Sequence, residues 1–365
     1  MNKSIVIRTD ASVQMGSGHV MRCATLADEL RANGATVTFV CRDLPGNYID
    51  WLLSKKHDVI RLASPVVSNG EGGDYPHHLH WLGVSLEQEI AEVNGVLSQY
   101  PVFDCMIVDH YALESQWERQ ISRFARKMMV VDDLADRQHE CDILLDQNYY
   151  RDMQSRYDDL VPASSMKLLG PGYALLRPEF IRARNHFRLR DGTVRRILVF
   201  LGGADPANET SKVIHALRML KRTYLKVDVV VGASNPHRSG IQALCEEDEN
   251  YQYHCQIDNI AELMLAADLA IGAGGSTLWE RGYLALPSLI IILAKNQEIA
   301  ARDLENIGAL KIIGESGKIS SHQIHEALNE CIDEKDILLS MSEISNSLVG
   351  HGAKRIQETI FTTLC

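Results

Sequence analysis

The sequence predicts an α/β protein built from two doubly wound, Rossmann-like domains that face a cleft. A short apolar run, a glycine turn and an amphipathic helix follow one another near the amino terminus, and the same order begins again near residue 195. The strand candidates are apolar almost throughout and end in polar residues, which is typical of strands buried on both faces of a parallel sheet. At 365 residues the chain is also longer than one ordinary hydrophobic core needs.

The first half predicts one parallel sheet. A strand over 4–10, a helix over 19–34 and a strand over 36–43 form a β-loop-α-β unit with a right-handed crossover. Further strands, with an amphipathic helix between the first two, are expected over 104–111, 127–133 and 141–148. The segment 66–83 is rich in glycine and histidine and has no periodicity, so it is expected to be a long loop.

The second half repeats the same order of elements. A strand and glycine turn over 195–206 lead into a helix over 208–220 and a strand over 226–234. We therefore expect an α/β domain over 1–170, a linker over 171–194, a second α/β domain over 195–350 and a C-terminal helix over 351–365.

Composition excludes several function classes. The net charge is 37 − 48 = −11, which disfavours a binder of nucleic-acid backbone. The eight cysteines form no C-x-x-C pair, which indicates buried thiols in a reducing compartment. The first residues lead directly into a strand and no apolar run reaches ~18 residues, so a cytoplasmic protein without a membrane span is expected.

The first candidate site is the stretch "QMGSGHVMR". Gly16 and Gly18 allow the backbone to approach a ligand, and His19 falls at the first turn of the following helix. Met21 stands where a dinucleotide fingerprint needs its third glycine, so a nicotinamide or flavin site is disfavoured. The stretch alone leaves two interpretations open, a site with a functional histidine or a tight turn with an incidental one.

Two glycine turns in the second half predict a nucleoside diphosphate site. Gly202 and Gly203 follow a strand in "LGGADP", and Gly275 precedes Ser276 in "GAGGSTLWERG". N–H groups of the second turn, at Ser276 and Thr277, suit phosphate, and the Glu280 carboxylate suits the hydroxyls of a ribose. Helix caps and a solvated glutamate are the alternative interpretation.

Two strand ends offer further polar groups. Asn296 and Gln297 follow "LIIIL", and Asp109, His110 and Tyr111 follow "CMIV". Asp109 could bind sugar hydroxyls or orient His19, while His110 could equally be structural. The run "HHLH" and the pair Asp132–Asp133 only superficially suggest metal ligands, so neither a metal site nor a cofactor is expected.

Six motifs, taken in order, resemble one family, the UDP-2,4-diacetamido-2,4,6-trideoxy-β-L-altropyranose hydrolases of pseudaminic acid biosynthesis, which have the GT-B glycosyltransferase architecture. The resemblance extends from Arg8 to about Asn306 and is carried by "RTDASVQMGSGHVMRCATLADEL", "VDHYALESQWE", "VVDDLADRQHECDILLDQN", "GPGYALLRPEF", "FLGGADP" and "AGGSTLWERGYLALPSLIIILAKNQ". No single motif is as specific as the six together.

The resemblance implies a division of roles. The N-terminal domain is expected to bind the sugar, with His19 as general base assisted by Asp109 or Tyr111, and the C-terminal domain is expected to bind UDP. Contacts to sugar or diphosphate are expected from Arg8, Asp10, Gly16, Gly18, His110, Gly202, Gly203, Asn296 and Gln297. Contacts to UDP are expected from Ile257, Gly275, Ser276, Thr277 and Glu280.

The expected reaction is metal-independent hydrolysis of a UDP-sugar with inversion at the anomeric carbon. It releases UDP and a free diacetamido sugar for a nonulosonic acid of a cell-surface glycan, such as flagellin or capsule. No nucleic-acid or membrane partner is expected, and a monomer is the default. The alternatives are a GT-B glycosyltransferase, a UDP-sugar 2-epimerase and a non-catalytic nucleotide-sugar binding protein.

Overall fold

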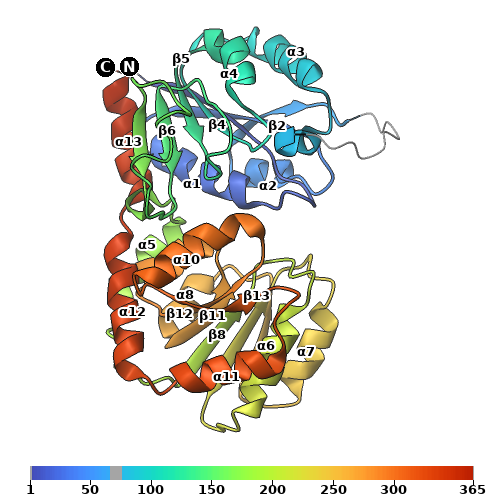
Figure 1. Ribbon diagram of the computed structural model, residues 1–365. Helices are drawn as coiled ribbons and strands as arrows, with labels where there is room; N and C mark the ends of the chain where they lie inside the picture. Colours follow the sequence, from blue (N-terminus) through green and yellow to red (C-terminus); the bar gives the residue numbers. More distant parts are fainter. Residues whose placement is uncertain (1, 66–75, 365) are drawn as a thin grey trace. The chain divides into compact units, whose positions relative to one another are not determined.

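The computed structural model describes residues 2–65 and 76–364 (Figure 1). The chain forms two compact units. The first unit comprises Met1–Asn148, Asp152–Leu175 and His351–Cys365, and the second comprises Tyr149–Arg151 and Leu176–Gly350. The described part of each unit contains one parallel sheet with helices on both faces.

The sheet of the first unit has, within the described residues, seven parallel strands in the order β3-β2-β1-β4-β5-β6-β7. The strands are β1 (Ser4–Thr9), β2 (Thr36–Arg42), β3 (Asp58–Leu62), β4 (Phe103–Asp109), β5 (Ala125–Val131), β6 (Ile143–Asp146) and β7 (Met166–Leu169). The chain adds β2 and β3 on one side of β1 and then returns to add β4 on the other. The strand order therefore reverses at β1 and β4, where doubly wound sheets bind their ligands.

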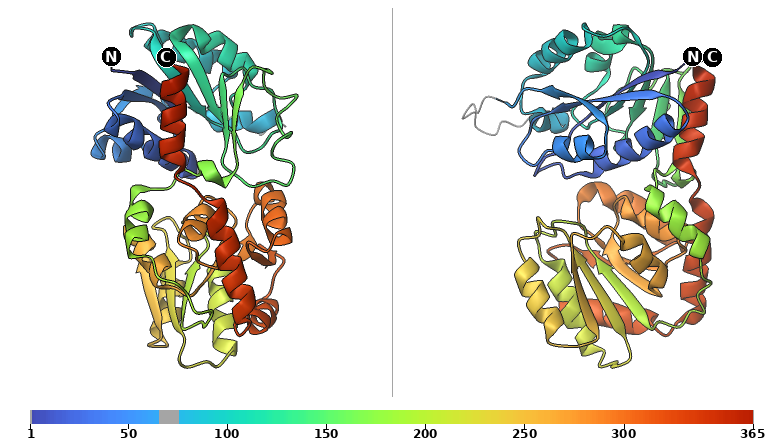
Figure 2. Two further views of the ribbon diagram at one scale, coloured as in Figure 1. Left: turned by 90° about the vertical axis from the view of Figure 1, so that its left-hand side faces the viewer. Right: turned by 180° about the vertical axis from the view of Figure 1, so that it is seen from behind.

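Helices cover both faces of this sheet. The elements are α1 (Gly18–Ala32), α2 (Ile49–Ser54), η1 (Pro76–Leu82), α3 (Leu86–Leu97), α4 (Ser115–Ile121), η2 (Ser122–Phe124), η3 (Pro171–Tyr173) and α13 (Gly352–Thr363). Apolar side chains of α1, α2 and α13 form one core cluster with the sheet, and those of α3 and α4 form the other. Figure 2 shows α13 lying along the first unit, where Ile356 and Ile360 are buried against α1.

The sheet of the second unit repeats this topology. Its described strands are all parallel, in the order β10-β9-β8-β11-β12-β13. They are β8 (Arg196–Phe200), β9 (Lys226–Val231), β10 (Tyr251–Cys255), β11 (Leu269–Ala273), β12 (Ser288–Ile292) and β13 (Lys311–Glu315). The strand order here reverses between β8 and β11, which gives a second ligand position of the same kind.

The helices of the second unit also form two layers, visible on both sides of its sheet in Figure 1. They are α5 (Pro178–Ala183), η4 (Arg184–His186), α6 (Glu209–Met219), α7 (Arg238–Glu246), α8 (Ile260–Ala266), α9 (Thr277–Tyr283), η5 (Lys295–Gln297), α10 (Glu298–Asn306), α11 (Ser321–Cys331) and α12 (Lys335–Leu348). Apolar side chains of α6, α7 and α11 share one core cluster with the sheet. A capping box between Ser320 and Gln323 fixes the start of α11.

The predicted fold class, two doubly wound α/β sheets, is confirmed, but the segment boundaries differ from those expected. The expected linker 171–194 contains α5 and η4, and its residues from Leu176 onward belong to the second unit. Arg190, for example, donates to the carbonyls of Met264 and Leu284. The expected separate helix 351–365 is α13, which belongs to the first unit.

The expected long loop 66–83 is partly helical. Residues 76–82 form the 3-10 helix η1 and the rest of the expected loop up to 75 lies outside the described residues. The strand expected over 104–111 ends at Asp109, so His110 and Tyr111 lie in the turn that follows.

Candidate active site

The carboxyl ends of β1 and β4 bring two predicted motifs together. Thr9 on β1 pairs with Asp109 at the end of β4. The chain leaves β1 through the glycine loop and enters α1, whose first turn carries His19. His19 and Asp109 therefore meet at the point where the strand order reverses.

The glycine loop leaves its backbone open beside His19. Gly16 has a φ of +73°, a conformation that L side chains rarely adopt, and its N–H donates to the Ser12 carbonyl at 2.8 Å. A Cβ atom built on Gly16 or Gly18 would meet no atom within 4 Å. The two predicted glycines thus border open space, as a loop that admits a ligand requires.

Arg22 is a site residue that the sequence pattern does not single out. Its guanidinium donates to both oxygens of Asp109, from Nε to Oδ2 and from Nη2 to Oδ1, each at 2.6 Å. Burial alone would raise the pKa of Asp109, but Arg22 and then His19 outweigh it and hold that pKa well below its usual range. Asp109 is therefore an ionised carboxylate.

This carboxylate fixes the tautomer of His19. Nδ1 of His19 lies 2.6 Å from Oδ1 of Asp109, and His19 is 6% exposed. Because an ionised carboxylate only accepts hydrogen bonds, Nδ1 carries the hydrogen and donates it. The lone pair of the neutral ring is then on Nε2, which is the arrangement of an oriented general base.

Tyr111 packs against the imidazole. The two rings are edge-on, with centroids 4.5 Å apart, and Trp81 of η1 stacks on Tyr111 at 5.5 Å. Burial, followed by the Asp133 carboxylate, holds the pKa of Tyr111 well above its usual value. The phenol keeps its proton and donates to Asp133, so Tyr111 can orient neighbouring groups but is not itself a base.

Three predicted substrate contacts are buried among protein groups, where a contact to substrate remains a prediction. Nδ1 of His110 accepts from the N–H of Ala112 at 3.0 Å, and Nε2 lies 3.5 Å from Oδ2 of Asp10. Burial lowers the pKa of His110, so this histidine is neutral. Asp10 also pairs with Arg8, from Nη1 to Oδ1 at 2.6 Å.

Arg8 is part of a larger buried ion network at the ends of β1 and β2. Its Nε donates to Glu89 of α3 at 2.8 Å, and Nη2 of Arg42 donates to the other oxygen of Glu89 at 2.5 Å. The backbone N–H of Arg42 donates to Asp10 at 2.6 Å. These contacts join the strand ends to α3, which supports a structural role for Arg8 and Asp10.

The two glycine turns of the second unit follow neighbouring strands, β8 and β11. Gly202 has a φ of +85°, and the carbonyl of Gly203 accepts from the N–H of Gly232 at 3.1 Å. Asp205 accepts from the N–H groups of Glu209 and Thr210 at 2.9 Å each, so it caps α6.

In the second turn, residues predicted to bind the diphosphate lie close to Gln297. Ser276 is the N-cap of α9 and its side chain makes no capping hydrogen bond, while Thr277 begins the helix. A Cβ on Gly275 would lie 3.7 Å from Nε2 of Gln297. Oε1 of Gln297 accepts from the N–H of Leu293 at 3.2 Å, and Asn296 is exposed on η5. The Gln297 amide nitrogen therefore faces the glycine turn.

Glu280 is held by a partner that the sequence pattern does not indicate. Arg177 donates from Nε at 2.7 Å and from Nη2 at 3.1 Å to the two carboxylate oxygens of Glu280. Glu179 pairs with Nη1 of the same guanidinium at 2.8 Å. Ile257, expected beside the uracil, is half-buried in the loop between β10 and α8.

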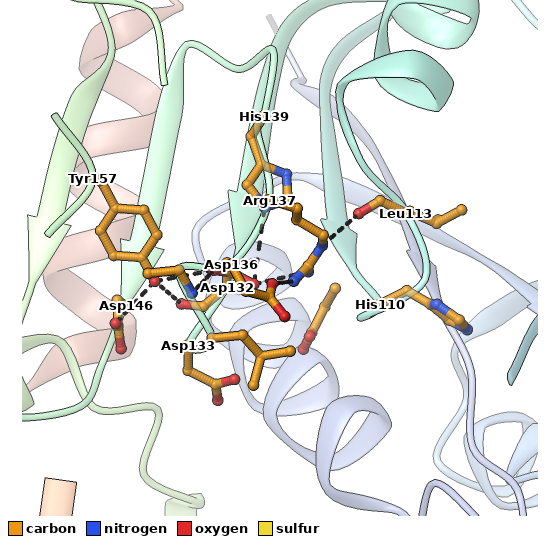
Figure 3. A network of polar contacts seen from close by, with 12 residues as sticks. His110, Leu113, Asp132, Asp133, Asp136, Arg137, His139, Asp146 and Tyr157 are labelled. Atoms are coloured by element: carbon orange, nitrogen blue, oxygen red, sulfur yellow. Dashed lines mark hydrogen bonds and ion pairs between the residues drawn. The ribbon is translucent and has the colours of Figure 1, made fainter. Parts of the chain in front are cut away.

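A second polar cluster lies at the ends of β5 and β6 (Figure 3). Arg137 pairs with Asp132 at 2.8 Å, and the Tyr157 hydroxyl lies 3.1 Å from Oδ2 of Asp132 and 3.0 Å from Oδ2 of Asp146. One hydroxyl hydrogen cannot serve both carboxylates. Burial, followed by the charge of Asp133, raises the pKa of Asp146 to about 8. Near neutral pH Asp146 is therefore largely protonated, and the hydroxyl of Tyr157 is the donor towards Asp132 or, in its alternative orientation, towards Asp146.

The protonated Asp146 predicts a pH dependence of stability. An acid whose pKa is raised on folding contributes stability that is present at low pH and is lost as the pH rises towards about 8. Between about pH 5 and pH 8, wild-type protein should lose stability relative to Asp146→Asn by up to about 1.4 kcal/mol per pH unit. Urea unfolding of both proteins at three pH values in this window measures the difference, and parallel pH profiles would contradict a protonated Asp146.

Residues 197–360 match the family model of the glycosyltransferase family 28 C-terminal domain. The UDP-2,4-diacetamido-2,4,6-trideoxy-beta-L-altropyranose hydrolase of Campylobacter jejuni is 26% identical over 304 residues, which cover 83% of this chain and 97% of that protein. The chain is a homologue of this hydrolase. The resemblance stated from the six motifs is thereby confirmed.

Two further matches bear on length and fold. An uncharacterised protein of Methanocaldococcus jannaschii is 26% identical over 80% of this chain, and the match spans only 56% of that longer protein. The crystal structure of MurG from Acinetobacter baumannii superposes with a TM-score of 0.68 at 14% identity, covering 99% of each chain. This likeness supports the GT-B-like fold. None of the described helices has the length and apolar composition that crossing a membrane requires.

Proposed function

We propose that this protein hydrolyses UDP-2,4-diacetamido-2,4,6-trideoxy-β-L-altropyranose, releasing UDP and 2,4-diacetamido-2,4,6-trideoxy-L-altrose. The observation that carries the proposal is the buried His19–Asp109 pair, which leaves Nε2 of His19 as the basic atom beside an open glycine loop. The similarity to the Campylobacter hydrolase over most of both chains supports the choice of substrate.

In the proposed reaction, water is the nucleophile and UDP is the leaving group. Nε2 of His19 accepts a proton as the water oxygen bonds to the anomeric carbon, and the bond from that carbon to the diphosphate oxygen breaks. Attack from the face opposite the diphosphate inverts the anomeric centre. Since UDP is a good leaving group, its departure does not require a strong general acid.

We assign UDP to the second unit. N–H groups after Gly203 and Gly275, together with the amides of Asn296 and Gln297, suit the diphosphate and would stabilise its developing charge. Glu280 suits the ribose, and the loop at Ile257 suits the uracil. The scheme uses no metal, and we expect a cytoplasmic monomer whose product enters pseudaminic acid synthesis.

Two experiments on product chemistry test this function. Purified protein is given several UDP-linked diacetamido-trideoxyhexoses, and sugar and UDP are followed by NMR, with the first anomer formed reporting inversion. In ¹⁸O-water the label should appear in the free sugar and not in UDP. Turnover of UDP-N-acetylglucosamine alone would contradict the assignment. Release of UDP only with an acceptor would indicate a glycosyltransferase, and an epimerised hexosamine would indicate a 2-epimerase.

Glu280→Gln should weaken UDP binding about 10- to 100-fold, because a hydrogen bond to a charged group is worth about 1.5–3 kcal/mol. Calorimetry measures the affinities for UDP and for its 2′,3′-dideoxy analogue. Their difference separates the contact with the ribose hydroxyls from the contacts with the diphosphate and the uracil. Wild-type protein should prefer UDP, and Glu280→Gln should lose this preference. Glu179→Gln is the matched control, since it removes the other carboxylate partner of Arg177. An unchanged preference in Glu280→Gln would place the ribose elsewhere.

A further inference from the structure

Arg22 contacts the carboxylate that orients His19 through two of its nitrogens. Both oxygens of Asp109 accept from Arg22 at 2.6 Å, and Nη1 of Arg22 donates to Asp133 at 2.9 Å. Sγ of Cys23 adds a fourth donor to Asp109 at 3.3 Å. His19, Arg22 and Cys23 share one face of α1, because residues three and four apart on a helix are neighbours.

We propose that Arg22 is the positioning residue of this site: it locks Asp109 in one orientation so that His19 is held as the Nδ1–H tautomer with Nε2 free to accept a proton. This inference rests on the proposed function for its kinetic consequences. Its geometric part, the state of the imidazole ring, holds whatever the substrate is.

Four donor atoms surround the Asp109 carboxylate, two from Arg22 and one each from His19 and Cys23. With Arg22 on both oxygens, only one direction at Oδ1 remains for Nδ1 of His19. Nη2 of Arg22 also lies 3.3 Å from Nδ1. Both are donors in the proposed tautomer, so they share Oδ1 as acceptor and do not bond each other. Without the bidentate contact the carboxylate could rotate, and the imidazole would lose its fixed orientation.

Arg22 also changes the electrostatic environment of the His19 imidazole. It compensates the Asp109 anion, which would otherwise favour the protonated imidazolium, and its own cation opposes a second cation nearby. The groups that face His19 come from α1, η1 and the ends of β4 and β5. They are Arg22, Cys23, Trp81, Asp109, His110, Tyr111 and, through Arg22 and Tyr111, Asp133. The charged members of this set are Arg22, Asp109 and Asp133, and Arg22 is the cation that contacts Asp109 directly.

The test compares three variants in the full-length protein. Arg22→Gln removes both the positive charge and the bidentate contact with Asp109. Arg22→Lys keeps the charge but cannot form the bidentate contact. Arg31→Gln is the control on the same helix, where Arg31 contacts His57. Two quantities are measured. One is the ¹⁵N shift pair of the His19 ring, which reports the tautomer without substrate, and the other is the pH profile of kcat and of kcat/KM.

For Arg22→Gln we expect mixed tautomers, a kcat reduced on the order of 10²-fold with KM little changed, and an acidic limb moved to higher pH. For Arg22→Lys we expect a similar loss in kcat with the acidic limb near its wild-type position. An unchanged Nδ1–H tautomer and an unmoved limb in a folded Arg22→Gln would overturn the proposal. If the tautomer changes but wild-type protein hydrolyses no UDP-sugar, the positioning role stands and the proposed function fails.

Discussion

Replacing His19 by glutamine is expected to lower kcat about 10²- to 10⁴-fold, because glutamine can occupy the site and hydrogen-bond Asp109 but cannot accept a proton. The His19 ring donates to the buried Asp109 carboxylate and borders the glycine loop. The affinity for UDP should stay within a few-fold of wild type, since UDP is assigned to the second unit. Initial rates of UDP release and calorimetry with UDP measure the two effects.

His322→Gln is the matched control for this substitution. His322 lies on α11 in the second unit, where its side chain is exposed and its Nδ1 lies 3.5 Å from the Glu326 carboxylate. The control should retain wild-type kcat. Hydrolysis by His19→Gln at more than a tenth of the wild-type rate would remove His19 from the role of general base and leave the open loop as a binding element only.

The meeting of His19 and Asp109 is predictable from the sequence because it depends on topology. An apolar strand, a glycine turn and a helix start are local patterns, and parallel strands bring their carboxyl ends to the same edge. His19 and Asp109 are 90 residues apart, yet Asp109 ends β4 and His19 stands in the first turn of the helix that the loop after β1 enters. The glycines near Gly16 and Gly275 are predicted for the same reason, since only a turn separates each from its strand.

The partners of these residues are less predictable. In the sequence Arg22 is an ordinary arginine within a predicted helix. No pattern in the neighbouring residues indicates that its guanidinium donates to Asp109. Arg177 reaches Glu280 from a segment that the sequence pattern suggests is a linker. Such pairs depend on how helices pack on the sheet, and one sequence contains no signal for that packing. The placement of α13 in the first unit has the same origin.

The buried charges at the strand ends give the second large expected effect. Glu89 is fully buried on α3 and accepts from Arg8 and Arg42 through its two oxygens. Burial alone would raise the pKa of Glu89, but Arg8 and Arg42 lower it below its usual value, so Glu89 is ionised. Among the described residues, removal of this carboxylate leaves the Arg8 guanidinium with Asp10 and the Val40 carbonyl, and the Arg42 guanidinium with the partly exposed Glu92 and the Ala63 carbonyl.

Glu89→Ala is therefore expected to lower the free energy of unfolding by about 3–5 kcal/mol, the range for removing one partner from a buried ion pair. Glu92→Ala is the matched control, because Glu92 also pairs with Arg42, at 2.6 Å, but is partly exposed and should contribute only about 0–1 kcal/mol. Urea unfolding followed by circular dichroism compares the two. Equal losses would mean that water reaches Arg8 and Arg42 in the variant, and the strand ends would then be held by β1 and β2 packing rather than by the ion network. If only Glu89→Ala lowers the free energy of unfolding, this ion network holds Asp10 in place. The same network then holds the ends of β1 and β2, beside which the candidate site lies.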